Sequence, residues 1–425
     1  MSKAVSGFSK FTKEEKINWL AKNFFSDVEK GVRTLKQYAN QNEKLQQLHD
    51  EFIENTISNF YVPYAIAPNF IINGKNYTIP MAIEESSVVA AASLVAKFWS
   101  TRGGFQAKVI STTKVGQVHF IYEGSFDKLK AYFDDMKPQL IEATDRLTVN
   151  MRKRGGGILD IELRDKTSDL RNYFQLHVTF ETADSMGANF INSCLEAIAK
   201  AFKNKDIQIV MSILSNYVPE CLVRAEVSCN VQDFFTENAE YYANKFIQAV
   251  EIANVEPYRA VTHNKGIMNG IDAVVLATGN DFRAVAAGAH AYACRSGKYK
   301  SLSNAKIEKG VFHFWLEIPL SLGTVGGLTK LHPLAKLSLD ILQNPSAKEL
   351  MQIIAVAGLA QNFAALKALT TTGIQQGHMK MHLVNILNQL EANLHEKEII
   401  TSVFEGSTVT QNAIAEALHK LRTEK

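Results

Sequence analysis

The chain has 425 residues, of which 46% are hydrophobic and 21% are charged, a composition typical of a globular protein with a sizeable core. The 46 basic and 43 acidic residues leave a net charge of +3, and the one local basic cluster is Arg152, Lys153 and Arg154, which argues against a nucleic acid partner. The longest apolar stretch, near 87–99, is too short and too interrupted by serine to cross a bilayer, so we expect no membrane contact.

The first hundred residues are expected to contain helices and one hairpin. Thr12–Glu15 and Ser26–Glu29 both match the capping box, in which a hydroxyl and a later carboxylate satisfy backbone donors at a helix start. Asn73 and Gly74 predict the turn of a β-hairpin between two apolar runs. An Ala-rich helix is predicted over 87–99.

Residues 107–216 show a different pattern. It predicts strands at 107–124, 158–165, 172–182 and 206–214, and helices at 126–151 and 187–202. The order β-α-β-β-α-β is the split βαβ arrangement, which indicates a compact domain inserted into a larger one. Helices and short strands resume after residue 217, and the last fifty residues are predicted to form a polar helical tail.

Motifs with a fixed spacing are absent. The four cysteines form no C-x-x-C pair or zinc spacing, and the N-terminus lacks the apolar core of a signal peptide, so we expect a cytoplasmic protein with reduced thiols and no metal. G-x-G-x-x-G, G-x-x-x-x-G-K-[ST], H-E-x-x-H and G-x-S-x-G do not occur. A catalytic site must therefore consist of scattered polar residues in apolar surroundings.

Two segments of the chain, around Glu85 and around Lys265, combine charged residues with an apolar run. Glu84 and Glu85 precede the helix at 87–99, where they either complement the helix dipole or include a partly desolvated acid with a raised pKa. Lys265, with Gly266 and Gly270, is predicted to lie in a loop that approaches a ligand and to face an anion or a developing oxyanion. Asp281 is either a helix N-cap or a carboxylate that orients the Lys265 ammonium.

Two further places have weaker signals. Gly187 joins a strand to a helix, which is either a plain turn or an anion site made by free amides. His378 follows a glycine at the base of the tail, and a lone histidine is most often an ordinary satisfied or exposed one. Neither residue alone decides between these interpretations.

Together these stretches resemble one family, the soluble bacterial second class of 3-hydroxy-3-methylglutaryl-CoA (HMG-CoA) reductases. The matching pieces are ENTISNFYVPYAIAPNF, EESSVVAAAS, DSMGANFIN, PYRAVTHNKGIMNGID, ATGNDFRAVAAGAHAYACRSG, GLAQN and GIQQGHM. They follow the family's order from near residue 50 to near residue 380. The resemblance implies a four-electron reduction of HMG-CoA to mevalonate and CoA by two NAD(P)H, through hemithioacetal and mevaldehyde intermediates.

The resemblance also implies four catalytic residues. Lys265 would stabilise the oxygen of the thioester and of the hemithioacetal, and Glu85 would donate a proton to the reduced carbonyl. Asp281 would hold this network in register. His378 would protonate the departing CoA thiolate.

Binding residues follow from the same resemblance. Contacts to the substrate are implied for Arg259, Ser87, Asn269 and Asn216, with Arg259 gripping the distal carboxylate. Residues 54–58 would lie along the CoA arm. The loop DSMGAN would form a non-Rossmann nucleotide site from Asp184, Met186, Gly187, Ala188 and Asn189.

The choice of nicotinamide cofactor depends on one position. NAD-using, mevalonate-degrading relatives carry an aspartate seven residues before a glycine triplet, and this chain has Thr148, seven before Gly155. Without that carboxylate, and with Arg152 nearby, the sequence favours NADPH and the biosynthetic direction. The alternative is that Arg152, Lys153 and Arg154 are solvated charges at the end of a helix, where they favour the helix dipole. An NADH-linked mevalonate-degrading enzyme and a catalytically silent CoA-binding relative stay as alternatives.

The expected architecture is α+β. A large, mostly helical CoA and substrate domain (1–108 and 217–372) would hold an inserted, small, ferredoxin-like β-α-β-β-α-β nucleotide domain (109–216), and a helical flap (373–425) would follow. The resemblance implies a homodimer with the active site at its interface. Which subunit supplies each catalytic residue, and whether dimers assemble further, stay open.

Overall fold

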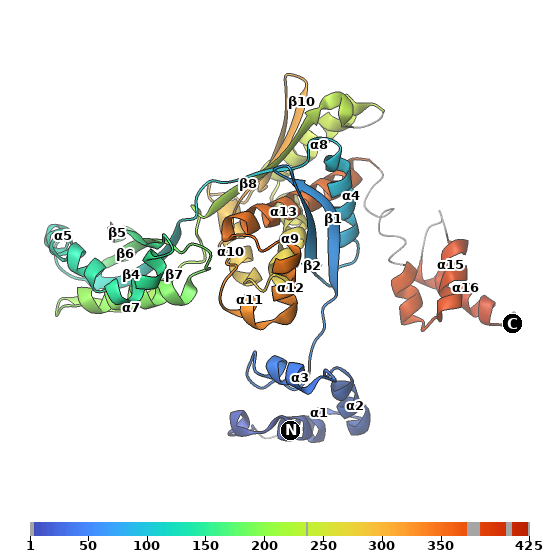
Figure 1. Ribbon diagram of the computed structural model, residues 1–425, viewed down its shortest axis with the longest axis horizontal. Coiled ribbons are helices and arrows are strands. Elements are labelled where there is room, and N and C mark those ends of the chain that lie inside the picture. Colours follow the sequence, from blue (N-terminus) through green and yellow to red (C-terminus); the bar gives the residue numbers. More distant parts are fainter. Residues whose placement is uncertain (1–3, 235–236, 372–382, 405–409, 424–425) are drawn as a thin grey trace. The chain divides into compact units, whose positions relative to one another are not determined.

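The computed structural model describes residues 4–234, 237–371, 383–404 and 410–423 (Figure 1). The chain divides into two compact units, Met1–Pro63 and Tyr64–Lys425. Helices combine with three small sheets, two of four strands and one of two, which confirms the predicted α+β class. The predicted domain boundaries at 108, 216 and 372 stay predictions.

The first unit contains short helices: η1 (Phe8–Lys10), α1 (Lys13–Phe24), α2 (Val28–Gln37) and α3 (Glu43–Asp50). The first predicted capping box is confirmed, because Thr12 N donates to the Glu15 carboxylate at 2.7 Å and Glu15 N donates to Thr12 Oγ1. The second is wrong. Asp27, rather than Ser26, caps α2 by accepting a hydrogen bond from Lys30 N at 2.9 Å.

The second unit begins with the predicted hairpin, β1 (Tyr64–Ile72) and β2 (Lys75–Ala82). Its turn residues Asn73 and Gly74 have φ of 50° and 81°, the left-handed region that Asn and Gly tolerate best. Helix α4 (Val88–Ser100) follows and packs against β1.

A four-stranded antiparallel sheet supports the largest core. Its strand order is β3 (Gln106–Val109), β8 (Leu222–Asn230), β10 (Val311–Pro319) and β9 (Ser303–Glu308). The remaining elements of this part are η2 (Val231–Asp233), α8 (Ala239–Val255), α9 (Pro257–Ala277), α10 (Phe282–Ala293), α11 (Leu328–Leu331), α12 (Pro333–Ile341) and α13 (Ala347–Thr370). Helices α9 and α13 pack against each other within this core.

Helix α13 is the central element. A Cβ atom at Gly270 of α9 would lie 2.4 Å from the carbonyl oxygen of Ala357, so glycine permits the close approach of the two helices. Among the described residues, α13 alone is long and apolar enough to cross a membrane, yet 72% of its apolar window is buried inside the protein. It is longer than the stretch at 87–99 that the sequence singled out.

The small sheet has the order β5 (Gly157–Asp165), β6 (Tyr173–Glu181), β4 (Lys114–Tyr122) and β7 (Ile207–Leu214), with all neighbours antiparallel (Figure 1). Its helices are α5 (Phe126–Glu142), α6 (Asp145–Arg152) and α7 (Ala188–Phe202). The chain order is therefore the predicted split βαβ arrangement, with one helix broken into α5 and α6. The predicted strand 107–124 is wrong as a single element, since β3 and β4 belong to different sheets.

The C-terminal residues form a small core of their own. Residues 383–389 are helical, and α15 (Leu394–Val403) and α16 (Gln411–Thr423) follow. Arg422 of α16 donates to both carboxylate oxygens of Glu396 at 2.9 Å, which ties α16 to α15. These contacts agree with the predicted helical tail.

Candidate active site

Two of the four predicted catalytic residues form an ion pair. Glu85 lies in the turn between β2 and α4, and Lys265 lies near the middle of α9, 180 residues further along the chain. The Lys265 ammonium donates to Glu85 Oε2. Lys265 is part of a continuous helix, so the predicted loop around it is wrong. Two glycines suggested that loop: Gly270 serves helix packing instead, and Gly266 is a helical position whose Cβ atom would have no neighbour within 4 Å.

The face of α9 that carries Lys265 is polar. Asn269 and Asp272 follow Lys265 by four and seven residues, which places all three on one side of the helix. Arg259 precedes Lys265 by six residues and therefore points about 120° away around the helix axis. Asn269 thus shares the Lys265 face, as expected for one site, whereas Arg259 of the same chain does not. Burial lowers the pKa of the Arg259 guanidinium.

Two polar atoms near this pair are buried without a hydrogen-bond partner among the described residues: Ser87 Oγ and Asp272 Oδ1. Ser87 also has φ of 73°, an uncommon conformation for a residue with a Cβ atom. An unpartnered buried polar group costs about 1–3 kcal/mol, and such costs concentrate where a polar ligand binds.

Asp272 is a candidate site residue that the sequence interpretation missed. Burial raises the pKa of its carboxyl from 3.8 to about 6, and the nearby Glu84 charge adds to this rise. The available signal was its spacing of seven residues from Lys265, which the expectation of a loop concealed.

Asp281 takes the N-cap position of α10. Its Oδ1 accepts hydrogen bonds from the backbone amides of Arg283 at 3.0 Å and Ala284 at 3.1 Å. Among the described residues, no hydrogen bond or ion pair joins Asp281 to Glu85 or Lys265 within one chain. The fourth predicted catalytic residue, His378, lies outside the described residues.

The DSMGAN loop ends at an open helix N-terminus. Gly187 has φ of 85° and is the N-cap of α7, a helix of 15 residues that has no side-chain cap. The backbone amides of Ala188 and Asn189 therefore lack a capping side chain, and such amides favour an anionic group. The loop itself is held by Ser185, whose Oγ accepts from Gly187 N at 3.0 Å.

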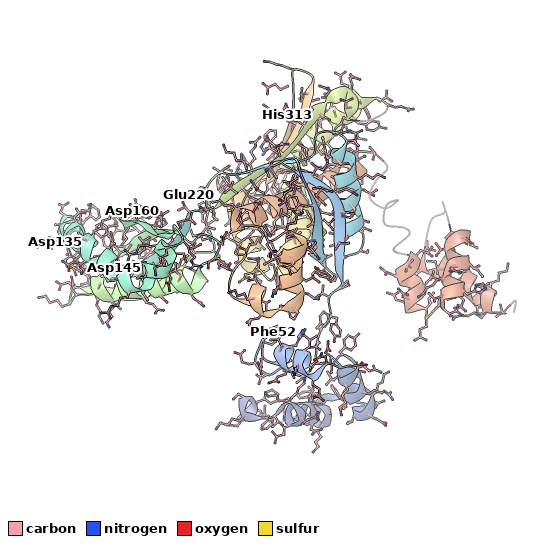
Figure 2. All side chains as sticks on the ribbon, in the orientation of Figure 1. Phe52, Asp135, Asp145, Asp160, Glu220 and His313 are labelled. Carbon is pink, nitrogen blue, oxygen red and sulfur yellow. The ribbon has the colours of Figure 1, made fainter. Side chains whose placement is uncertain are left out.

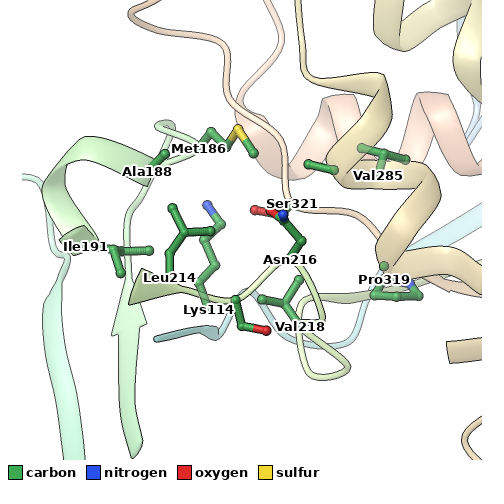
Figure 3. A pocket seen from close by; sticks show the side chains of 13 residues that line it. Lys114, Met186, Ala188, Ile191, Leu214, Asn216, Val218, Val285, Pro319 and Ser321 are labelled. Carbon is green, nitrogen blue, oxygen red and sulfur yellow. The ribbon is translucent and has the colours of Figure 1, made fainter. Parts of the chain in front are cut away.

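A pocket opens beside this loop, toward α10 (Figure 3). Its lining includes Lys114, Met186, Ala188, Ile191, Leu214, Ser215, Asn216, Val218, Ala284, Val285, Gly288, Pro319 and Ser321. The backbone carbonyl of Asn216 lies against α10, since a Cβ atom at Gly288 would be 2.7 Å from it. Asn216, which was predicted to bind substrate, thus lies with the residues of the nucleotide loop.

Lys114 is the second site residue that the sequence interpretation missed. Its side chain is 4% exposed, and Nζ donates to the Ser185 carbonyl at 2.8 Å and to Thr182 Oγ1. Figure 3 shows this amine pointing into the pocket. Burial lowers the pKa of the Lys114 ammonium. In the sequence Lys114 is one polar residue in a strand, and nothing local indicates that it supports the loop at 182–187.

The residues predicted to select the cofactor differ in accessibility. Thr148 is 3% exposed, and its hydroxyl donates to the carbonyls of Thr144 and Asp145, both at 3.1 Å. Arg152 is exposed and pairs with the Asp145 carboxylate at 2.9 Å. Asp145 lies on the surface of the small-sheet region (Figure 2). Arg152 can therefore exchange this partner for a ligand, whereas the Thr148 side chain is enclosed.

Comparison with known proteins identifies the family. The sequence model described as hydroxymethylglutaryl-coenzyme A reductase matches residues 13–383. A 3-hydroxy-3-methylglutaryl-coenzyme A reductase from Archaeoglobus fulgidus is 37% identical over 427 residues, covering 100% of this chain and 96% of that protein.

Comparison with solved structures finds members of the same family. A 3-hydroxy-3-methylglutaryl-coenzyme A reductase from Streptococcus pneumoniae aligns with a TM-score of 0.74 and 35% identity, covering 99% of this chain and 100% of that one. A class II enzyme from the same organism, bound to NADPH in open conformations, aligns with a TM-score of 0.73 and 36% identity, covering 87% and 100%. This chain therefore belongs to the hydroxymethylglutaryl-coenzyme A reductase family, and in structure it matches a bacterial class II member.

Proposed function

We propose that this protein reduces HMG-CoA to mevalonate and CoA in the cytoplasm, using two NADPH in the biosynthetic direction. The observation that carries the proposal is the ion pair between Lys265 and Glu85, close in sequence to the unpartnered hydroxyl of Ser87. A cation, a proton donor and a free hydroxyl are the groups that a carbonyl needs when it gains a hydride.

The first reduction adds a hydride to the thioester carbon, which the reduced nicotinamide supplies when bound. The carbonyl oxygen becomes negative, the Lys265 ammonium stabilises it, and Glu85 protonates it to give the hemithioacetal. As the C–S bond then breaks, the hydroxyl proton returns to Glu85 and the electron pair leaves with sulfur. His378 protonates that thiolate, so it cannot add back.

The second reduction uses the same groups. Mevaldehyde gains a second hydride at its carbonyl carbon, Lys265 again stabilises the oxygen, and Glu85 supplies the proton of the final alcohol. Asn269 lies on the Lys265 face of α9 and is suited to orient the substrate. Arg259 would grip the distal carboxylate, and its position on another face of α9 favours a contribution from a second chain.

Residues around the DSMGAN loop fit a dinucleotide. The uncapped amides at the start of α7 suit a phosphate, and the buried Lys114 amine supports the loop by donating to the Ser185 carbonyl. The glycine triplet lies against the same region, because a Cβ atom at Gly156 would be 2.5 Å from the Glu181 carbonyl, three residues before Asp184. This contact places the end of α6, with exposed Arg152, beside the strand that leads into the loop.

The preference for NADPH is supported by Arg152 more than by Thr148. An exposed guanidinium suits a 2′-phosphate, since its planar fork can donate two hydrogen bonds to one phosphate. Thr148 contributes only through the absence of a carboxylate, because its hydroxyl is already bonded within α6.

A homodimer is part of the proposal. Glu85 and Lys265 pair with each other, but neither is bonded to Asp281 of the same chain. Each site would therefore be completed by Asp281 of a second copy. Closed two-fold symmetry then gives two equivalent sites per dimer.

A direct assay tests the activity. The protein is mixed with HMG-CoA and either NADPH or NADH, and the absorbance of the reduced nicotinamide is followed. We expect oxidation that depends on HMG-CoA and is faster with NADPH. A preference for NADH would instead support a mevalonate-degrading enzyme, and no oxidation with either nucleotide would support a silent CoA-binding relative.

A further inference from the structure

The nucleotide loop and the turn that carries Asp281 are connected through a third segment, at 323–324. The backbone amide of Thr324 donates to the carbonyl of Asp184 at 2.9 Å. The amide of the preceding residue, Gly323, donates to Asn280 Oδ1 at 2.8 Å. Of these two consecutive amides, that of Thr324 bonds to the loop, and that of Gly323 bonds to Asn280, the residue next to Asp281.

The contact between the loop and this segment is close. A Cβ atom at Gly323 would lie 2.5 Å from Met186 N and 3.1 Å from the carbonyl carbon of Ser185. Real Cβ atoms do not approach backbone atoms this closely, so the two segments touch backbone to backbone and leave no space between them. A shift of one segment must therefore move the other.

The loop is also anchored on its far side. One carboxylate oxygen of Asp184 accepts a hydrogen bond from Ala347 N, at the first residue of α13, at 2.7 Å. Because α13 is the buried central helix, the loop is anchored to a rigid element on that side, and the hydrogen bonds of residues 323–324 connect it toward Asp281 on the other.

The side chain of Asn280 is held at both ends. Its Oδ1 faces the amide of Gly323, which can only donate, so the orientation of the carboxamide is unambiguous. Its Nδ2 donates to Thr278 Oγ1 at 3.2 Å, and Thr278 is fully buried. The backbone amide of Asn280 donates to Val275 O at 2.9 Å, at the end of α9.

We propose that Asn280 is a positioning residue that holds the Asp281 carboxylate in register with the dinucleotide loop through Gly323. The inference depends on the proposed function, since it assigns the loop to dinucleotide binding and Asp281 to the reaction. Asn280 itself touches neither reactant. It acts through its hydrogen bond to Gly323 and through its chain neighbour, Asp281.

The variant Asn280→Ala tests this role, because it removes the hydrogen bonds of the carboxamide to Gly323 and Thr278 without adding volume. We expect kcat to fall about tenfold and KM for NADPH to rise, while KM for HMG-CoA stays the same, because a 1 Å misplacement of a catalytic group lowers the rate by up to about a hundredfold and the loss of one positioning contact shifts Asp281 less than that. Asn280→Asp keeps an acceptor for Gly323 N and should restore part of the loss. Asn254→Ala, which removes an amide that bonds to Val250 O and Asn304 on α8 and β9, is the matched control and should change neither constant.

A double-mutant cycle separates positioning from general structural damage. If Asn280 acts through Asp281, Asn280→Ala lowers kcat much less in an Asp281→Asn background than in the wild type, whereas it still raises KM for NADPH. Losses that multiply independently in the double variant would overturn the proposal, as would wild-type constants for Asn280→Ala. If Asn280→Ala does not fold, the same cycle is run with Asn280→Asp.

Direct binding distinguishes failure of this inference from failure of the proposed activity. NADPH binding is followed by fluorescence in the absence of HMG-CoA, for the wild type and for Asn280→Ala. Wild-type protein that binds NADPH but reduces nothing contradicts the activity, and a weaker NADPH affinity of the variant then still supports the connection. An active wild type with equal NADPH affinity in the variant contradicts the connection alone.

Discussion

Lys265 and Glu85 carry opposite charges, yet their side chains remain 59% and 39% exposed. Exposed ion pairs contribute about 0–1 kcal/mol to stability, because water screens the charges. The pair is therefore poorly explained by folding and well explained by chemistry, in which an accessible ammonium meets negative charge on a substrate.

Replacing Lys265 should separate activity from stability. We expect Lys265→Ala to lose at least about a hundredfold in kcat, since one oxyanion donor is worth 10²–10³. Its melting temperature, followed by circular dichroism, should stay close to that of the wild type. Lys306→Ala removes an equally exposed lysine that pairs with Glu308, and it should keep full activity. A wild-type rate for Lys265→Ala would refute the assigned role.

Asp272 should make stability depend on pH. Its carboxyl has a pKa of about 6 in the folded protein against 3.8 as an ordinary value, so the folded state holds the proton more tightly than the unfolded state does. The contribution of Asp272 to stability is therefore fully present below about pH 4, is lost as pH rises from about 4 to about 6, and changes no further above that.

Asp272→Asn removes this dependence while keeping the shape of the side chain. The melting temperature of the variant relative to the wild type should be higher at pH 7 than at pH 4. Asp340→Asn, at an exposed position on α12, should show no such difference between the two pH values. An equal offset at both pH values would contradict the buried acid.

Lys265, Glu85 and Asp281 could be named as candidate catalytic residues from sequence because they lie in long segments that resemble the family, and their roles stay predictions. Asp272 and Lys114 could not, because their importance comes from burial by segments far away in the chain. Lys114, for example, is significant only because Thr182 and Ser185 fold over its amine.

At the scale of elements, α9 and α13 pack closely, since a Cβ atom at Gly270 would lie 2.4 Å from the Ala357 carbonyl oxygen. The sequence predicted the capping box at Thr12–Glu15, the Asn-Gly hairpin and the split βαβ order correctly, since these features depend on local patterns. It failed at 107–124 and around Lys265, where local patterns were ambiguous. A strand does not reveal which sheet it joins, and the glycine five residues after Lys265 does not reveal that a second helix lies against it.

Two glycines on α9 provide a matched pair of variants. Gly270→Ala places a Cβ atom 2.4 Å from the Ala357 carbonyl oxygen, so we expect a loss of about 1–3 kcal/mol in the free energy of unfolding. Gly266 has no neighbour within 4 Å of such an atom, so Gly266→Ala should gain about 0.5–1 kcal/mol from helix propensity. Urea unfolding measures both, and equal effects would contradict the close helix contact.

At the scale of the whole molecule, the three predicted catalytic residues that the structure describes divide into two groups. Glu85 and Lys265 are joined to each other, whereas Asp281 is joined to the nucleotide loop through Asn280 and Gly323. One chain therefore presents two parts of a site, and a homodimer that combines them would contain two complete sites.

Complementation between inactive variants tests this arrangement. When Lys265→Ala and Asp281→Ala chains are co-expressed, half of the dimers are mixed and each mixed dimer has one intact site, so about a quarter of wild-type activity should return. Lys265→Ala with Glu85→Ala should restore nothing, because these two residues pair within one chain. Absence of activity in the first mixture, with dimers present, would assign Asp281 to the same chain as Lys265.

The pairing of β3 with β8 has a consequence for how the chain can be taken apart. Val109 lies opposite Val223, so the points where the chain leaves and rejoins the large sheet are neighbours, although 113 residues lie between them. A short linker can span that gap. Replacing 112–216 by a few glycine and serine residues should therefore leave a shorter protein that still folds around α13 and still pairs Glu85 with Lys265. The small sheet would then be a separable module, and the shortened protein would keep the proposed acyl-CoA site without the proposed nucleotide site.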